Sequence, residues 1–235
     1  MGIEIADRSG YTARMNEVLA FDRRRAVVLT IDLQREYLDD AVGQAVVEPD
    51  EAARVLEANR RLLDAAREAG VPVVHAYVVR RPYEAESGIY AGGLAYIKAA
   101  QDHGVSQSPH RPPRTRHDRL AGTPESQVPD ELVAPSDIHV TSKKNLDSFA
   151  HTELGFLFSR VIRPEFVIMT GINTDTCVYS TTFTAANLGY SPIVVRDCVA
   201  SMRGRDSHEM ALELMSRSIA WVLGLDDVLK RLRDS

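Results

Sequence analysis

A cysteine stands where a buried strand is predicted to give way to a helix. The apolar run from Phe166 to Met169 ends in a turn that contains glycine, and Cys177 then opens a segment with apolar and small residues at helical spacing until Gly189. Backbone N–H groups at a helix start lack partners, and the helix dipole there favours an anion, so we expect the position to lower the pKa of the thiol. Cys177 is therefore a candidate nucleophile. The alternative is a packed core residue, because free cysteine is among the most buried residue types.

An aspartate closes the first predicted strand. The run from Ala26 to Ile31 is apolar and β-branched without alternation, which is typical of a strand buried on both faces of a parallel sheet. Asp32 follows at once, and ligands of open α/β sheets bind outside the carboxyl ends of the strands. Asp32 is therefore well placed for chemistry, with the capping of a turn as the alternative.

The rest of the chain alternates between helical and strand patterns. A helix with an apolar stripe is predicted over 48–70 and a buried strand over 71–79, which is the order of a right-handed parallel crossover. Further strands are predicted at 138–141, 166–169 and 192–197, and further helices at 11–21, 206–221 and 226–232. These patterns predict an α/β fold.

Composition excludes several classes of protein. A chain of 235 residues with 44% hydrophobic content can bury a full core, and a length below ~250 favours one domain, which we place at 26–235 after an N-terminal arm of residues 1–25. The net charge of −5 argues against a nucleic-acid or membrane-surface protein. Two cysteines make no disulfide framework, and no secretory or membrane-spanning pattern is present, so we expect a reduced, cytoplasmic protein.

Residues 80–123 form the least regular stretch, with several prolines and the basic run HRPPRTRHDR from His110 to Arg119. Only 93–103 fits a short helix, so we expect a long loop that shapes the substrate pocket. An arginine in this loop would offer a planar fork to a substrate carboxylate. Charge clusters usually lie at the surface, however, which favours a solvated or subunit-facing position for these side chains.

The stretch from Thr170 to Tyr190 resembles the signature of the isochorismatase-like cysteine hydrolases. That signature reads G-[VI]-x-T-[DN]-x-C-V, followed by threonine, alanine and G-[FY] at fixed offsets. The matching positions are Gly171, Ile172, Thr174, Asp175, Cys177, Val178, Thr181, Ala185, Gly189 and Tyr190. The resemblance covers about 26–232 apart from the 80–123 loop. It implies a three-layer αβα sandwich around a mostly parallel sheet.

The resemblance also implies a catalytic triad. Asp32 opens a stretch that fits the family's D-[ML]-Q-x-x-[FY] pattern, in which the aspartate is the base, and Cys177 holds the place of the nucleophile. Lys143 has the spacing of the catalytic lysine in K-x-x-x-S-x-F, with the adjacent Lys144 as the alternative. Asp147 stands where that pattern usually has serine.

Further site residues follow from the same resemblance. The backbone N–H groups of Asn173 and Cys177 would form an oxyanion hole, and the Ile172–Asn173 peptide would be cis. The residues that we expect to contact substrate are Gln34, Tyr37, Phe149 and Ile172.

No catalytic metal and no cofactor are predicted. In the related nicotinamidases the strand that corresponds to 71–79 is followed by a D-x-H pair that helps to bind a divalent metal. Here Tyr77 to Glu84 reads YVVRRPYE, which has no equivalent pair. His75 lies inside the strand, where a structural role is favoured.

These features predict a cysteine-dependent amidohydrolase. Its substrate would be a small linear amide or ureide of the N-carbamoyl, biuret-like or maleamate-like kind, cleaved through a thioester with release of ammonia, in an enzyme that we expect to be a homo-dimer or homo-tetramer. A nicotinamidase is an alternative against which the missing metal pair argues. Isochorismate hydrolysis is a second, but the relatives that perform it lack the cysteine. A non-catalytic binding protein of the same fold is a third, and the complete set of Cys177, Asp32 and Lys143 argues against it.

Overall fold

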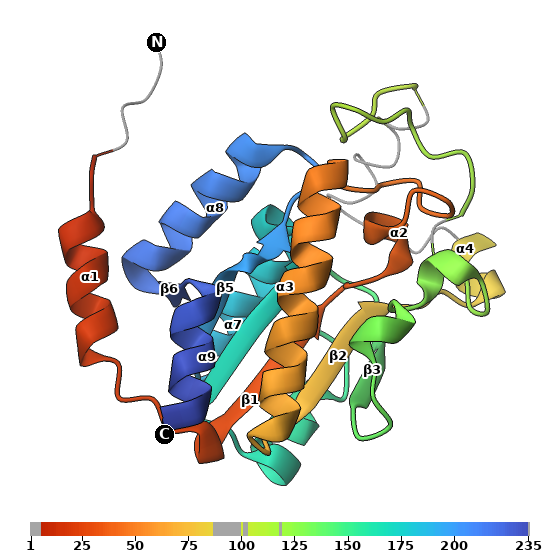
Figure 1. Ribbon diagram of the computed structural model, residues 1–235. Coiled ribbons are helices and arrows are strands. Elements are labelled where there is room, and N and C mark those ends of the chain that lie inside the picture. Colours follow the sequence, from red (N-terminus) through yellow and green to blue (C-terminus); the bar gives the residue numbers. More distant parts are fainter. Residues whose placement is uncertain (1–5, 87–99, 101–102, 118, 235) are drawn as a thin grey trace.

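The computed structural model describes residues 6–86, 100, 103–117 and 119–234. They build one six-stranded sheet in the order β3-β2-β1-β4-β5-β6, with helices on both of its faces (Figure 1). Every neighbouring pair of strands is parallel. The predicted three-layer α/β fold is confirmed. Most of the helix predicted at 93–103 lies outside the described residues.

The strands agree with the sequence patterns in β1 and β2 and depart from them in the other four strands. Their bounds are β1 (Ala26–Ile31), β2 (Val73–Val78), β3 (Ile138–Lys143), β4 (Phe166–Ile172), β5 (Ser191–Ala200) and β6 (Trp221–Leu223). β1 and β2 lie where they were predicted, whereas β3, β4 and β5 extend further towards the carboxyl edge. β6 was not predicted, because its residues were assigned to the end of the helix at 206–221 or to the connection after it.

The helices have these bounds: α1 (Ser9–Val18), α2 (Arg35–Leu38), α3 (Pro49–Glu68), α4 (Pro82–Glu86), α6 (Leu154–Phe156), α7 (Tyr179–Asn187), α8 (Arg205–Ser218) and α9 (Leu225–Asp234). Short 3₁₀ turns lie at Arg23–Arg25, Pro124–Ser126 and Asp130–Leu132, and π-helical segments form η4 (Leu157–Ile162) and η5 (Thr174–Val178). α3 begins with Pro49 and has Asp50 and Glu51 in its first turn, which suits the free N–H groups and the dipole there.

Two apolar layers enclose the sheet. On one face, α3 and α9 pack on a core that includes Val28 from β1 and the fully buried Leu62 from α3, and Figure 1 shows both helices crossing the front of the sheet. On the other face, α7 and α8 pack on a core that includes Val27 and Leu29. Successive residues of β1 thus serve opposite layers, which is why the strand is apolar throughout. Each fully buried side chain of this size contributes about 2 kcal/mol.

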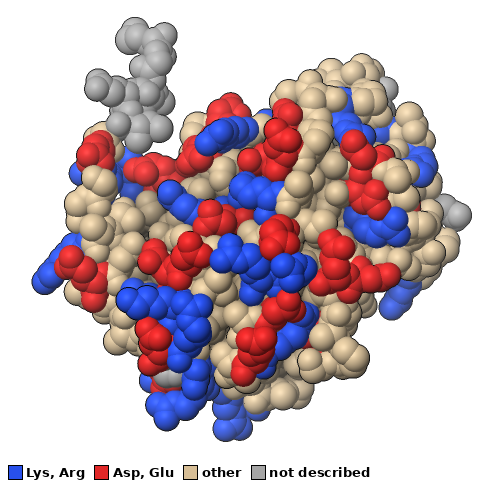
Figure 2. All heavy atoms as spheres, viewed as in Figure 1, with Lys and Arg blue, Asp and Glu red and all other residues tan. Residues whose placement is uncertain are grey.

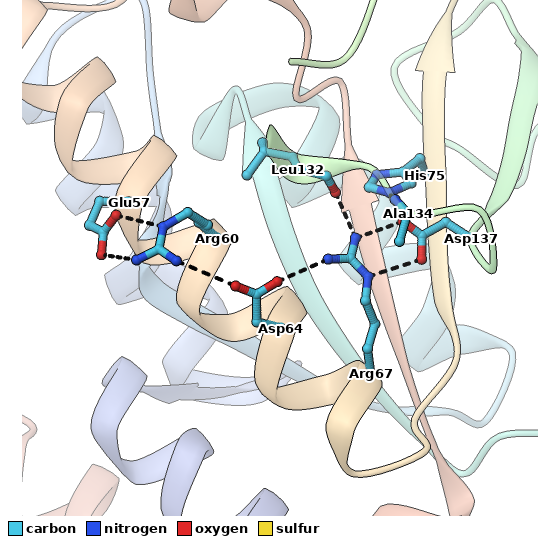
Figure 3. Close-up of polar contacts among 8 residues, drawn as sticks. All are labelled: Glu57, Arg60, Asp64, Arg67, His75, Leu132, Ala134 and Asp137. Carbon is cyan, nitrogen blue, oxygen red and sulfur yellow. Dashed lines mark hydrogen bonds and ion pairs between the residues drawn. The ribbon is translucent and has the colours of Figure 1, made fainter. Parts of the chain in front are cut away.

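A buried polar network joins α3 to the sheet (Figure 3). Arg67 donates from Nη2 to Asp137 Oδ2 at 2.6 Å, and His75 Nε2 lies 3.1 Å from the same oxygen. The other ring nitrogen of His75 lies 2.7 Å from Thr30 Oγ1. Burial lowers the pKa of His75 to about 4, so the ring is neutral at pH 7. His75 therefore has the structural surroundings that its place in a strand predicted.

The N-terminal helix lies beside the short edge strand β6. Trp221 donates from Nε1 to the carbonyl of Met15 at 3.0 Å, and Tyr11 donates to the carbonyl of Arg217 at 3.3 Å. The division between an arm at 1–25 and a domain at 26–235 stays a prediction.

Acidic and basic side chains are interleaved on the face that carries α3 and α9 (Figure 2), with no broad area of one sign. Several pairs are regular helical neighbours, such as Arg60 with Glu57 at 2.8 Å. No helix within the described residues is long and apolar enough to cross a membrane.

Candidate active site

The proposed site residues gather where the sheet reverses its strand order. From β1 the chain adds β2 and β3 on one side, and from β4 it adds β5 and β6 on the other. Crevices at such a switch point, outside the carboxyl ends of the strands, are the usual ligand sites of open α/β sheets. Asp32 follows β1 at this point, and the Ile172–Asn173 peptide that ends β4 is cis, as predicted.

β1 and β4 approach each other closely at this edge because Gly171 has no side chain. Its φ of 126° is one that other residues rarely adopt, and a Cβ on it would lie 1.9 Å from the carbonyl oxygen of Ile31. The glycine therefore sets the distance between the strand that carries Asp32 and the turn that leads to Cys177.

Asp32 and Lys143 form a buried ion pair. Lys143 Nζ lies 2.6 Å from Asp32 Oδ2, and both side chains are fully buried. The second carboxylate oxygen accepts the backbone N–H of Val78 at 3.1 Å. The register between β2 and β3 is irregular here, with Val78 opposite both Ser142 and Lys143. β3 thus ends with Lys143 directed across β2 towards Asp32.

Lys144 points to a different place. Its ammonium donates to the carbonyl of Val79 and pairs with Glu84 at 2.9 Å. Of the two adjacent lysines, the structure therefore places Lys143 beside Asp32. The catalytic role of Lys143 stays a prediction.

Cys177 lies in the first turn of the helical segment and does not open it. The π-helical turn η5 begins at Thr174, and α7 continues it from Tyr179. The thiol is only 6% exposed. Burial raises its pKa, the Lys143 ammonium lowers it, and the Asp32 carboxylate raises it. The expectation of a lowered pKa is wrong, because loss of solvation, together with the charge of Asp32, outweighs the charges of Lys143 and Arg119.

The turn before Cys177 is held by its own backbone and by the end of β5. The carbonyl of Asn173 accepts the N–H groups of Thr176 and Val178, each at 3.1 Å. Asn173 Oδ1 accepts the N–H of Met202 at 2.8 Å. These contacts fix the backbone that carries the N–H groups of Asn173 and Cys177, whose oxyanion-hole role stays a prediction.

Three of the four residues predicted to contact substrate have mainly structural contacts. Gln34 is fully buried and donates from Nε2 to the carbonyls of Val78 at 2.8 Å and Ser126 at 2.7 Å. Ile172 is fully buried in the core on the α3 face. The ring of Phe149 stacks on Tyr190 with the ring centroids 6.1 Å apart. Their contacts with substrate stay predictions.

Tyr37, the fourth, is buried and meets an arginine that the sequence did not single out. Arg119 donates from Nη1 to the Tyr37 hydroxyl at 2.7 Å, and only 6% of Arg119 is exposed. The same basic run also places Arg114 2.9 Å from the fully buried carboxylate of Glu36. The surface position favoured for these charges is wrong for both arginines, which dock on the chain that follows β1. A single sequence gives little warning of this, apart from the apolar Leu120 that follows the run and forms a β-bridge with Arg80.

Other polar residues near the site have structural surroundings. His208 lies 2.8 Å from Thr174 Oγ1 through Nδ1, and burial lowers its pKa. Cys198 is fully buried in the core, and burial raises its pKa. Within the described part of the chain, no three His, Cys, Asp or Glu side chains form a group suited to a metal ion.

Comparison with family models identifies the family of this chain. The family model described as the isochorismatase domain matches residues 26–227. The chain belongs to the isochorismatase family. The match covers every strand of the sheet and all three of Asp32, Lys143 and Cys177.

Curated relatives and a solved structure resemble the chain over most of its length. Maleamate amidohydrolase of Pseudomonas putida is 25% identical over 227 residues, which cover 96% of this chain and 95% of that protein. A ureidoacrylate amidohydrolase of Methylorubrum extorquens is 28% identical and covers 88% of this chain and 82% of its own. Among solved structures, a cysteine hydrolase of Pseudomonas syringae pv. phaseolicola superposes with a TM-score of 0.74 at 19% identity, over 92% of this chain and 95% of that one.

Proposed function

We propose that this isochorismatase-family protein is an amidohydrolase that cleaves the C–N bond of a small linear amide or ureide and releases ammonia. The observation that carries the proposal is the buried pair of Asp32 and Lys143, 2.6 Å apart, whose charges act on the buried Cys177 at the switch point of the sheet. Similarity to proteins named maleamate and ureidoacrylate amidohydrolases supports the choice of reaction.

The first step is the transfer of the Cys177 proton to Asp32. Because burial raises the pKa of the thiol, the free enzyme holds it mainly protonated, and a base in contact with it is required. As the proton leaves, the sulfur attacks the carbonyl carbon of the amide. Lys143 stabilises the negative charge on the carboxylate before transfer and on the thiolate after it.

The second step breaks the C–N bond. Charge gathers on the carbonyl oxygen of the tetrahedral intermediate, where the backbone N–H groups of Asn173 and Cys177 would donate to it, each worth ~3 kcal/mol. Collapse of the intermediate expels the nitrogen, which takes the proton from Asp32 and leaves as ammonia. The acyl group then remains on Cys177 as a thioester.

Water completes the cycle through the same base. Asp32 takes a proton from a water molecule, whose oxygen adds to the thioester carbonyl, and collapse releases the carboxylic acid product and the sulfur of Cys177. The sulfur regains its proton from Asp32. One carboxylate thus moves protons in both halves of the reaction, which fits its burial between Lys143 and the N–H of Val78.

A screen for ammonia release over small linear amides and ureides tests the proposal. We expect at least one compound to be cleaved, and Cys177→Ala to reduce that activity by several orders of magnitude while the protein stays folded. Mass spectrometry of the trapped intermediate should place the acyl group on the peptide that contains Cys177. The matched variant Cys198→Ala should keep turnover. Undiminished activity in Cys177→Ala would refute the mechanism.

A further inference from the structure

Arg119 is a buried cation that the proposed triad does not use. It ends a run of basic residues in the chain, yet only 6% of it is exposed. Removal of a guanidinium from water is costly unless the fold gives it specific contacts. The fold must therefore hold the Arg119 side chain in place through specific contacts.

The backbone of Arg119 is fixed at the edge of the sheet that carries the site. Its φ is 56°, in the left-handed region, and its carbonyl accepts the N–H of Arg80 at 2.8 Å. Ala121 in turn donates its N–H to the carbonyl of Arg80 at 2.8 Å. Arg80 lies just beyond the end of β2, close to Val78, whose N–H binds Asp32. Arg119 and the proposed base Asp32 are thus both hydrogen-bonded to the backbone at the carboxyl end of β2.

The side chain of Arg119 is directed at Tyr37. Its Nη1 donates to the tyrosine hydroxyl at 2.7 Å, and its Cζ lies 5.4 Å from the centre of the ring. The charge of Arg119 lowers the pKa of Cys177, so the guanidinium lies within electrostatic reach of the thiol. Burial raises the pKa of Tyr37, which keeps its hydroxyl protonated at neutral pH. That hydroxyl accepts from Arg119 and still carries an O–H that can donate.

We propose that Arg119, together with the Tyr37 hydroxyl, recognises a carboxylate on the substrate, so that the amide cleaved by this protein is an anion. The inference rests on the proposed amidohydrolase function and names its substrate class. A guanidinium presents a planar fork that matches the two oxygens of a carboxylate. Lys143 already balances the charge of Asp32, so the positive charge of Arg119 within electrostatic reach of Cys177 favours a substrate anion there.

Alkylation of Cys177 tests the inference without knowledge of the substrate. Iodoacetate and iodoacetamide both form a carbon–sulfur bond with loss of iodide, and they differ in that only iodoacetate carries a carboxylate. We expect Arg119→Met to reduce the iodoacetate rate about 10-fold or more relative to the iodoacetamide rate, since one ion pair with a buried cation is worth at least 1.4 kcal/mol. The ratio of the two rates cancels any change in the amount of thiolate.

Three further variants sharpen the result. Arg119→Lys keeps the charge without the fork and should give an intermediate ratio, whereas Tyr37→Phe should shift the ratio in the same direction by a smaller factor. Arg116→Met is the matched control, because Arg116 belongs to the same run but is exposed and donates to the carbonyl of Val42 at 2.6 Å. Its ratio should equal that of the wild type.

Equal slowing of both reagents in Arg119→Met would overturn the inference, because Arg119 would then act only on the ionisation of the thiol. If that variant does not fold, an unchanged ratio in both Arg119→Lys and Tyr37→Phe would overturn it equally. If Arg119→Met changes the rate ratio as expected but the wild-type protein releases ammonia from no amide, the proposed function is refuted and the anion site is still supported. Amide hydrolysis without the ratio effect would refute the anion site alone.

Discussion

The ionisation of Cys177 is set by competing effects that the structure makes visible. A helix start and a nearby ammonium both favour the thiolate, but they act on a cysteine that is only 6% exposed and whose pKa the Asp32 carboxylate raises. Burial is the largest of these effects, and the pKa is raised. In the proposed mechanism the sulfur would therefore gain its nucleophilic form through proton transfer to Asp32 in the course of the reaction.

Lys143 and Lys144 provide a matched pair of variants at the residue scale. Lys143→Met keeps the apolar stem but removes the cation 2.6 Å from Asp32, and we expect kcat/KM to fall at least ~100-fold. The pKa of Cys177 should also rise, because Lys143 is the charge that lowers it most. The rate of Cys177 alkylation against pH measures that shift, which should be towards higher pH.

Lys144→Met is the control for this experiment. The Lys144 ammonium pairs with Glu84 at 29% exposure, so its loss should change stability by less than ~1 kcal/mol and leave turnover near that of the wild type. A folded Lys143→Met protein with full activity would contradict the triad. Because a buried Asp32 without its partner is costly, the unfolding transition of Lys143→Met has to be recorded beside its activity.

At the scale of elements, the close approach of β1 and β4 depends on one glycine. Gly171→Ala would place a Cβ 1.9 Å from the backbone oxygen of Ile31, so we expect a loss of about 3 kcal/mol or more in the free energy of unfolding, together with loss of activity. Gly155→Ala is the matched control, since no atom lies within 4 Å of its added Cβ. That helical change should be neutral or slightly stabilising. Equal stability of the two variants in denaturant titrations would show that the strands can separate without cost.

The buried network between α3 and β2 makes stability depend on pH. His75 has a pKa of about 4 in the folded protein, below the value of 6.5 for an exposed histidine, so the unfolded chain binds more protons between these values. The free energy of unfolding should therefore fall as the pH drops from 6.5 to 4, by about 3 kcal/mol from this group. His75→Gln should flatten that slope, and substitution of the exposed His151 should preserve it. A wild-type slope in His75→Gln would disprove the assignment.

The sequence predicts elements where one local pattern decides the structure. β1 is buried on both faces and is therefore a continuous apolar run, β2 is a mostly apolar run interrupted by His75 and Tyr77, and α3 has an apolar stripe with a proline start. β6 escaped prediction because three residues are too few to show a period. The register irregularity that turns Lys143 towards Asp32 has no sequence signal either, since it arises from pairing between β2 and β3.

At the scale of the whole molecule, the sequence likewise predicts some residues of the candidate site and not others. Cys177 and Asp32 stand out because each ends or follows a pattern that the sequence shows directly. The contact between Asp32 and Lys143 joins residues that are 111 positions apart in the chain. Lys143 was identified as a candidate only through the resemblance to a family. Arg119 was predicted to lie at the surface. Composition alone does not distinguish an arginine that is exposed to solvent from one that packs against buried residues.

The whole reaction should proceed without a metal ion, which is the last prediction. The proposed chemistry takes its nucleophile from Cys177 and its charge stabilisation from backbone N–H groups and Lys143, so neither a Lewis acid nor a metal-bound water is required. The stretch after β2, in which the sequence has no D-x-H pair, contains the cationic Arg80, which is only 3% exposed. Exhaustive chelation should therefore leave the rate of ammonia release unchanged for any amide found by the screen. Loss of activity on chelation, with recovery on addition of zinc and cleavage of nicotinamide, would instead favour a nicotinamidase, and it would mean that ligands outside the YVVRRPYE stretch hold the metal.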